Sequence, residues 1–276
     1  MRLEHFKVVQ IVSCLCEGMG VRATSRVIGC HKDTVLQVLE TVGPKCEAFL
    51  DRTLRNLTVD HLQIDELWAR VYCKQSNTHA EDMEAGDFYT FLALDAKSKL
   101  LVDHFTGKRS AWSTGRFIGS LAKRITGRVQ ITTDGWHAYP SCIARNFWGR
   151  TDYAMLQKMY KGDPWKDTER KYSPAPFIGI RIEPILGWPK PHGICTSHIE
   201  RANLTVRTFN RRFTRLCLGY SKKAQNHRLA VALFVAHYNF CKAHAAHKLT
   251  PAHAHKLTDH KWTTQELIEQ ITAGQN

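Results

Sequence analysis

The sequence lacks the features that mark several large classes of protein. It has no apolar run near the roughly 18 residues that cross a bilayer, and its first residues, MRLEHFKVVQ, lack the charged and then apolar layout of a signal peptide. None of its nine cysteines forms a CxxC pair, so their spacing does not indicate a zinc site. We therefore predict a cytosolic globular protein with reduced thiols and no membrane partner.

Acidic residues are scarce relative to basic ones. Lys and Arg total 39 against 25 for Asp and Glu, which gives a formal net charge of +14. A surplus of this size favours a polyanionic partner such as nucleic acid. It is steepest over residues 196–248, where Glu200 is the single acid and Lys or Arg stands at positions 201, 207, 211, 212, 215, 222, 223, 228, 242 and 248. A lone carboxylate in such a basic field is a candidate functional group.

The first 43 residues predict a small all-α unit. Its helices span 5–19, 21–29 and 31–43, and Gly29-Cys30 supplies the turn between the second and the third. Two helices joined by a short Gly-containing turn are typical of a helix-turn-helix, which binds DNA through its second helix. In that interpretation the residues facing bases and phosphates are His31, Lys32, Thr34 and Gln37. A helical cap without DNA contact is the alternative.

The rest of the chain predicts an α/β region over 61–250, reached through a linking helix over 44–60 that follows Gly43-Pro44. The predicted elements are a strand at 61–73, a hairpin at 88–107, a helix at 110–127, a strand at 128–136 and a helix at 137–149. Six prolines predict an irregular insertion over 150–195. Helices over 196–217 and 222–244 follow, and then a polar C-terminal tail over 251–276 with a short helix at 263–271.

Three acids stand out by their surroundings. Asp65 lies within an apolar strand, Asp134 closes another, and Glu200 opens a basic helix. A carboxylate beside a buried strand is costly unless a cation compensates it, although a turn at Asp134 and an Arg partner for Asp65 would also suffice. In a sheet of this order the first and fourth strands are neighbours, so Asp65 and Asp134 could converge, with Glu200 arriving from a helix across the sheet. Clustered carboxylates repel one another unless a divalent cation such as Mg²⁺ or Mn²⁺ binds them.

The helix that begins near Glu200 carries a polar stripe. Asn203, Arg207 and Arg211 follow the acid at +3, +7 and +11, which predicts one helix face that meets DNA phosphates; a solvated face is the alternative. Glu66 adjoins Asp65, but alternation along a strand predicts that it points to the opposite face and stays out of the metal site.

Several motifs carry a family resemblance. IDELW at 64–68, TDGWHAY at 133–139 and SHIERANLTVR at 197–207 resemble the three acidic motifs of Insertion Sequence 1 family transposases. Three further blocks resemble the C-terminal half of that family: RRFTRL at 211–216, SKKAQNH at 221–227, and YNFCKAH with LTPA over 238–252. The resemblance covers nearly the whole chain.

The resemblance implies an RNase H-like mixed sheet flanked by helices and a DDE transposase with Asp65, Asp134 and Glu200 as its catalytic metal ligands. Two Mg²⁺ or Mn²⁺ ions about 3.5–4 Å apart would activate a water or 3′-hydroxyl and stabilise the leaving oxygen. Arg207 would clamp a phosphate. The implied partners are double-stranded DNA and further copies of the chain, in a homo-oligomer that synapses two transposon ends in the bacterial cytoplasm. The alternatives are a catalytically silent DNA-binding derivative and an RNase H-like nuclease without strand joining.

Overall fold

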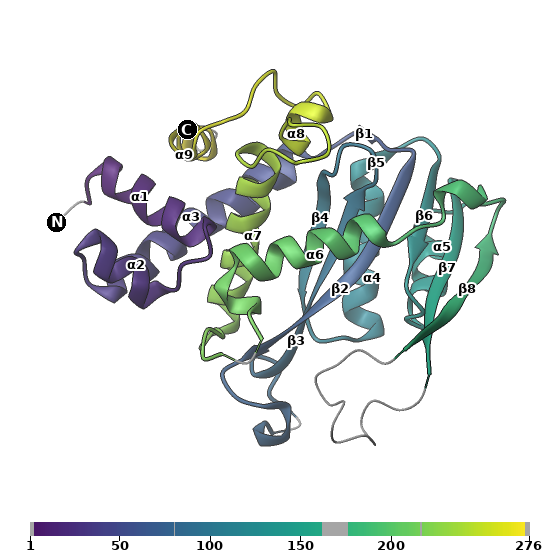
Figure 1. The fold of residues 1–276 in the computed structure, drawn as a ribbon, viewed down its shortest axis with the longest axis horizontal. Coiled ribbons are helices and arrows are strands. Elements are labelled where there is room, and N and C mark those ends of the chain that lie inside the picture. Colours follow the sequence, from purple (N-terminus) through teal and green to yellow (C-terminus); the bar gives the residue numbers. More distant parts are fainter. Residues whose placement is uncertain (1–2, 80, 162–175, 216, 274–276) are drawn as a thin grey trace.

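A computed structural model of the chain describes residues 3–79, 81–161, 176–215 and 217–273 (Figure 1). Its helices are α1 (His5–Cys16), α2 (Val21–Ile28), α3 (Lys32–Thr53), α4 (Ala111–Arg124), α5 (Tyr139–Asn146), α6 (Ser197–Phe209), α7 (Ala224–Phe240), α8 (Pro251–Ala254) and α9 (Thr264–Ala273). Its strands are β1 (Leu57–Thr58), β2 (His61–Val71), β3 (Gly86–Asp95), β4 (Leu101–Gly107), β5 (Ile125–Thr126), β6 (Val129–Thr133), β7 (Thr151–Tyr160) and β8 (Phe177–Leu186). Short 3-10 turns are η1 (Gln75–Asn77), η3 (Pro191–Gly193) and η4 (Arg211–Phe213).

Six strands form one mixed sheet in the order β4-β3-β2-β6-β7-β8. β2, β3 and β4 are antiparallel neighbours; a short turn joins β3 to β4, whereas a longer connection that contains η1 joins β2 to β3. After α4 the chain returns to the other side of β2, where β6 and then β7 add in parallel. β8 closes the sheet as an antiparallel edge strand. The first predicted strand therefore lies beside the fourth, as the sequence pattern indicated.

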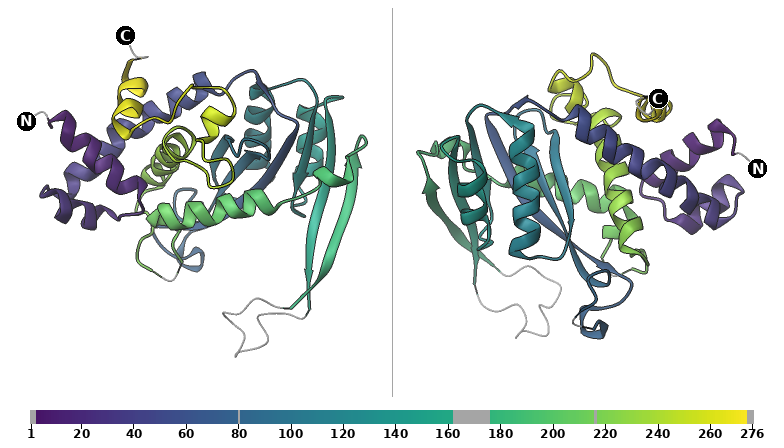
Figure 2. Two further views of the ribbon diagram at one scale, coloured as in Figure 1. Left: turned by 45° about the horizontal axis from the view of Figure 1, so that its top comes forward. Right: turned by 180° about the vertical axis from the view of Figure 1, so that it is seen from behind.

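Helices cover both faces of this sheet. α6 crosses one face over β2, and α4 and α5 lie on the other, which is the near side in the view from behind (Figure 2). The predicted mixed sheet flanked by helices is therefore confirmed. Most of its buried apolar side chains join those of α1, α3, α7 and α9 in one large core, while Val71 and Phe88 form a small separate cluster with Ala224. Over the described ranges, no helix has both the length and the apolar character that a membrane span needs.

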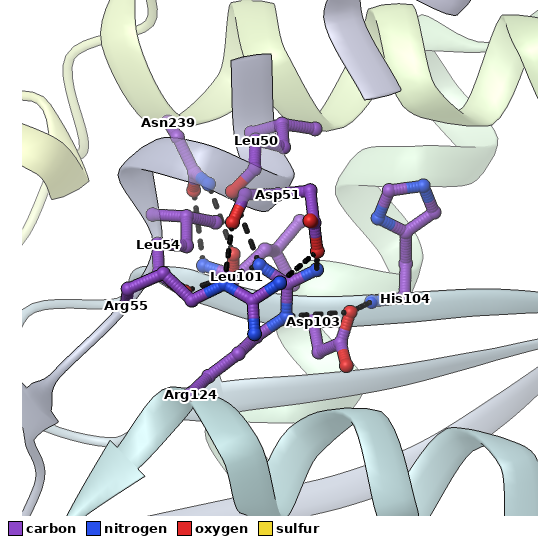
Figure 3. Close-up of polar contacts among 9 residues, drawn as sticks. All are labelled: Leu50, Asp51, Leu54, Arg55, Leu101, Asp103, His104, Arg124 and Asn239. Atoms are coloured by element: carbon purple, nitrogen blue, oxygen red, sulfur yellow. Dashed lines mark hydrogen bonds and ion pairs between the residues drawn. The ribbon is translucent and has the colours of Figure 1, made fainter. Parts of the chain in front are cut away.

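A buried arginine ties α3 to the sheet. Arg124, at the end of α4, donates hydrogen bonds to the carbonyl oxygens of Leu50 and Leu54, and its Nε lies 3.1 Å from Asp103 Oδ1 on β4 (Figure 3). The side chains of Arg124 and Asp103 are only 8% and 3% exposed, so each compensates the other's buried charge. Asn239 of α7 adds a second link through both its amide atoms to the backbone of Leu101.

The predicted end of the third helix at Gly43-Pro44 is wrong. α3 runs on through both residues to Thr53, although an internal proline removes one backbone hydrogen bond. Packing against α7 explains this, because a Cβ on residue 43 would lie 2.6 Å from Leu229 Cβ. Gly43 thus allows α3 and α7 to pack closely, and this buried contact stabilises α3 as one continuous helix through Pro44.

The predicted irregular insertion over 150–195 is also wrong where its described residues form strands. Residues 151–160 and 177–186 form β7 and β8, a long antiparallel pair that extends away from the body of the molecule (Figure 2). Pro184 is tolerated in β8 because an edge strand needs hydrogen bonds on one side only. Pro164 and Pro174 lie outside the described residues, while Pro189 and Pro191 belong to the connection into α6.

Candidate active site

Asp65 and Asp134 lie where one strand stops and its neighbour continues. β2 and β6 pair in parallel up to Ile64 and Thr133. β6 then ends in a turn, in which Trp136 N donates a 3.0 Å hydrogen bond to Asp134 Oδ1. β2 continues along β3, so Asp65 lies one residue beyond its last pair with β6. This register places the two carboxylates at the same open edge.

Glu200 reaches this edge because β2 anchors the first turn of α6. Gln63 is 2% exposed, and its Oε1 accepts hydrogen bonds from His198 N and Ile199 N, both at 3.0 Å. These amides are among the helix N-terminal donors that have no intrahelical partner. Asp65 lies two residues after Gln63 and therefore on the same face of β2. Its Oδ2 accepts a 2.7 Å hydrogen bond from Asn203 Nδ2. The two contacts fix α6, and with it Glu200, across β2.

Three carboxylates crowd together at the edge. One oxygen from each of Asp65, Glu66 and Asp134 lies within 4.8 Å of the others. Burial and the charges of Asp134 and Glu200 raise the pKa of Asp65 to about 6. Burial and the charge of Asp134 raise the pKa of Glu66 to about 7, and burial also raises the pKa of Asp134. Mutual repulsion of this kind is what a bound cation relieves.

The donor set fits a hard divalent cation. All three groups offer carboxylate oxygens, which suit Mg²⁺ and Mn²⁺ better than softer metals. Glu66 Oε1 is buried and has no hydrogen-bond partner within the described part of the chain, which leaves a ligand atom free. Asp65, Glu66 and Asp134 are therefore the residues that could hold an ion, with Glu200 beside them.

The prediction that Glu66 stays out of the acidic cluster is wrong, because its carboxylate lies within 4.8 Å of those of Asp65 and Asp134. Alternation does send the two side chains to different partners, since Asp65 contacts Asn203 while Glu66 Oε2 lies 3.2 Å from Arg109 Nη2. β6 ends before it reaches Asp65 and Glu66, however. On the β6 side of β2, therefore, no strand backbone lies between the two carboxylates. Asp134, at the open edge, lies close to both.

Arg109 is a site residue that sequence reasoning missed. Its Nη2 also lies 3.5 Å from Asp134 Oδ2, so one guanidinium bridges two of the acids. The guanidinium packs over the rings of Trp136, at 4.2 Å from the centroid, and Tyr89, at 5.6 Å. Arg109 immediately precedes the N-cap of α4, and no motif in the sequence distinguishes it from other surface arginines.

Glu200 has a different counter-ion. Lys158 Nζ of β7 lies 2.6 Å and 2.5 Å from its two carboxylate oxygens, and Thr196 Oγ1 donates a 2.8 Å hydrogen bond to Oε1. Sequence reasoning missed Lys158 because the segment that contains it was predicted to be irregular. Pairing of β7 with β6 is what carries the lysine to the open edge.

No protein-family model and no curated protein matches the chain. Among solved structures it is similar to a piggyBac transposase in a synaptic complex with hairpin DNA, determined by cryo-electron microscopy. The TM-score is 0.45 and the identity 9%, over 97% of this chain and 69% of that one. A likeness of this size assigns neither family nor activity.

The predicted polar stripe on α6 is only partly present. Asn203 is 4% exposed and is directed at Asp65, so it positions a carboxylate instead of facing a ligand. Arg207 is partly buried on the same helix, and its charge lowers the pKa of Asp65 against the larger effect of burial. Arg211 lies beyond the end of α6 in η4, so the prediction that it shares one helix face with Glu200 is wrong.

The four predicted DNA contacts of the N-terminal unit lie at the start of α3. Gly29 follows the last residue of α2, and its φ of 68° is the left-handed conformation common after a helix. His31 then caps α3 by accepting a hydrogen bond from Asp33 N, and Lys32 and Gln37 are exposed while Thr34 is partly buried. The arrangement places these side chains on an accessible helix end, and their contact with DNA stays a prediction.

Proposed function

We propose that the chain is a DDE-type DNA transposase, which cleaves DNA at transposon ends and joins the freed ends to a target. The observation that carries this proposal is the convergence of acids from β2, the end of β6 and α6 on one edge of a mixed sheet. The raised pKa values of Asp65 and Asp134 indicate a site built for added positive charge. Asp65, Asp134 and Glu200 form the metal-binding triad in this proposal, with two Mg²⁺ or Mn²⁺ ions.

Each element of the site has a role in such a reaction. Bound divalent ions supply activation of a water or 3′-hydroxyl and stabilisation of the leaving oxygen. Asn203 keeps Asp65 oriented through its 2.7 Å hydrogen bond, which fixes one ligand before DNA binds. Arg207, seven residues after Glu200 on α6, binds a phosphate next to the cleaved bond. The net charge of +14 supports binding of the remaining DNA backbone.

The finer assignments belong to the same proposal. The resemblance of the three acidic motifs supports membership of the Insertion Sequence 1 family, and the strand order supports an RNase H-like catalytic domain. The N-terminal helices would recognise the transposon ends as a helix-turn-helix, through His31, Lys32, Thr34 and Gln37. Two ends must be held together, so we expect at least a dimer in the active complex.

The test is cleavage and strand transfer on a labelled duplex that carries the sequences flanking this gene in its own genome, with Mg²⁺ present. Asp65→Asn and Glu200→Gln should abolish both steps while DNA binding persists. Asp152→Asn is the matched control, because this acid of β7 pairs with Arg128 at the far end of the strand. Cleavage that persists in either triad variant would refute the proposed site.

A plain metal-dependent nuclease is the second candidate. The acidic cluster alone would suffice for it, since hydrolysis needs the ions and no recognition of DNA ends. Such an enzyme would cut the labelled duplex without preference for the flanking sequences and give no joined products. Joined products from the wild type, absent in Glu200→Gln, would exclude it.

A further inference from the structure

The acids of the site are compensated unevenly. Arg109 contacts Glu66 and Asp134, and Lys158 contacts Glu200, whereas Asp65 has no ion pair within the described ranges. Arg207 acts on Asp65 through its charge without forming an ion pair, so the four acids face three cations and the edge keeps a net negative charge. One divalent ion would more than offset this charge, and a second ion would leave a larger excess of positive charge unless an anion joins it.

Lys158 binds the two Glu200 carboxylate oxygens that a second ion would need as ligands. Its Nζ lies within 2.6 Å of both carboxylate oxygens of Glu200, so the ammonium already occupies the position that a chelated cation takes. Glu200 lies outside the cluster of Asp65, Glu66 and Asp134, but near enough for its charge to raise the pKa of Asp65, together with the larger effect of burial. An ion shared by Asp65 and Glu200 therefore has to displace the lysine.

Displacement is feasible because the pair is not locked. The side chains of Lys158 and Glu200 are 34% and 39% exposed, and the lysine stem is long and flexible. Lys158 lies in the second half of β7, which pairs with β8 and no longer pairs with β6. Its ammonium can swing toward solvent without breaking any backbone pairing.

We propose that Lys158 is a tethered counter-ion that occupies the Glu200 half of the metal site until an ion displaces it, and that the displaced ammonium then binds a backbone phosphate of the DNA. The inference rests on the proposed function and adds an order of events to it: the ion first displaces Lys158, and the released ammonium then binds the DNA. Loading of the ion at Glu200 and binding of DNA become mutually favourable, because the phosphate accepts the lysine that the ion releases. Lys158 is a positioning residue in this scheme.

The experiment measures Mn²⁺ binding by the loss of the free-ion electron paramagnetic resonance signal, with and without a DNA duplex, on the full chain. Lys158→Met should tighten the weaker Mn²⁺ site by about two- to fivefold without DNA, the size expected for loss of a partly exposed ion pair. Addition of DNA should tighten Mn²⁺ binding in the wild type and in Lys158→Arg, and should do so much less in Lys158→Met.

A Glu200→Gln background supplies the control. Lys158→Met should leave Mn²⁺ affinity unchanged there, because the pair it removes no longer exists. Equal Mn²⁺ affinity in the wild type and a folded Lys158→Met, or the same change in both backgrounds, would overturn the inference. It would leave the transposase proposal intact if strand transfer by the wild type is still observed. A wild type that binds no Mn²⁺ at all would overturn both.

Discussion

Asp65→Asn is expected to stabilise the protein while it abolishes cleavage, because the carboxylate that would hold the ions is buried among like charges. Its pKa rises from 3.8 to about 6 in the folded chain. Each pH unit by which a pKa moves corresponds to about 1.4 kcal/mol, so keeping Asp65 ionised costs on the order of 3 kcal/mol.

The sign of the pH dependence follows from the direction of the shift. The folded-state pKa lies above the unfolded value, so the stability from this group is complete below about pH 4 and is lost as the pH rises through about 6. Asparagine removes that loss. It also keeps its contacts, since the Asn203 amide can flip and present its buried Oδ1, which has no partner in the described residues, to the new amide.

The assay is thermal and urea unfolding in metal-free buffer at about pH 4 and about pH 8. Asp65→Asn should melt about 6–12 °C above the wild type at the higher pH, from about 2–4 °C for each kcal/mol, and close to the wild type at the lower pH. Asp152→Asn should show the opposite sign, because Arg128 holds the pKa of Asp152 below its usual value. The reasoning would be refuted if Asp65→Asn did not raise the melting temperature at about pH 8, or raised it equally at both pH values.

Three further variants test the fold and the DNA contact. Arg124→Met leaves Asp103 buried without its partner, so urea unfolding should show a loss of about 3–5 kcal/mol, largely recovered when Asp103→Asn is added. Gly43→Ala should cost about 1–3 kcal/mol in the same assay, since the new Cβ would lie 2.6 Å from Leu229 Cβ; a neutral effect would mean that α3 and α7 can move apart. Arg207→Gln should reduce the slope of log affinity for DNA against log salt by about 1; an unchanged slope would exclude a phosphate contact.

The sequence predicted β2, β3, β4, β6 and most helices, because their patterns are local. The apolar run around Asp65, the turn at 95–99 and the period of α7 each identify one element without reference to the rest of the chain. The errors arose where distant packing decides. Pro44 stays within α3 because Leu229 of α7 lies against Gly43, and the proline-rich segment forms β7 and β8 because β6 offers a partner.

The candidate site was predictable as far as its acids have distinctive neighbours in the sequence. Asp65, Asp134 and Glu200 each stand at a boundary between patterns, and the predicted strand order brings the first two together. Glu66 was excluded by alternation, a rule that assumes a neighbouring strand on each side, and β6 ends one residue too early for that. Arg109 and Lys158 come from a loop and a strand whose positions depend on tertiary pairing, so no local pattern could identify them.

Direct ligation of a divalent ion by Asp134 is the central claim, and a change of metal preference tests it most directly. Asp134→Cys replaces a hard oxygen ligand with a softer thiolate, which favours Mn²⁺ over Mg²⁺. We predict that this variant cleaves the labelled duplex with Mn²⁺ and not with Mg²⁺, while Asp152→Cys cleaves with both ions. Full activity of Asp134→Cys with Mg²⁺ would contradict the account, because the ion would then not depend on that side chain.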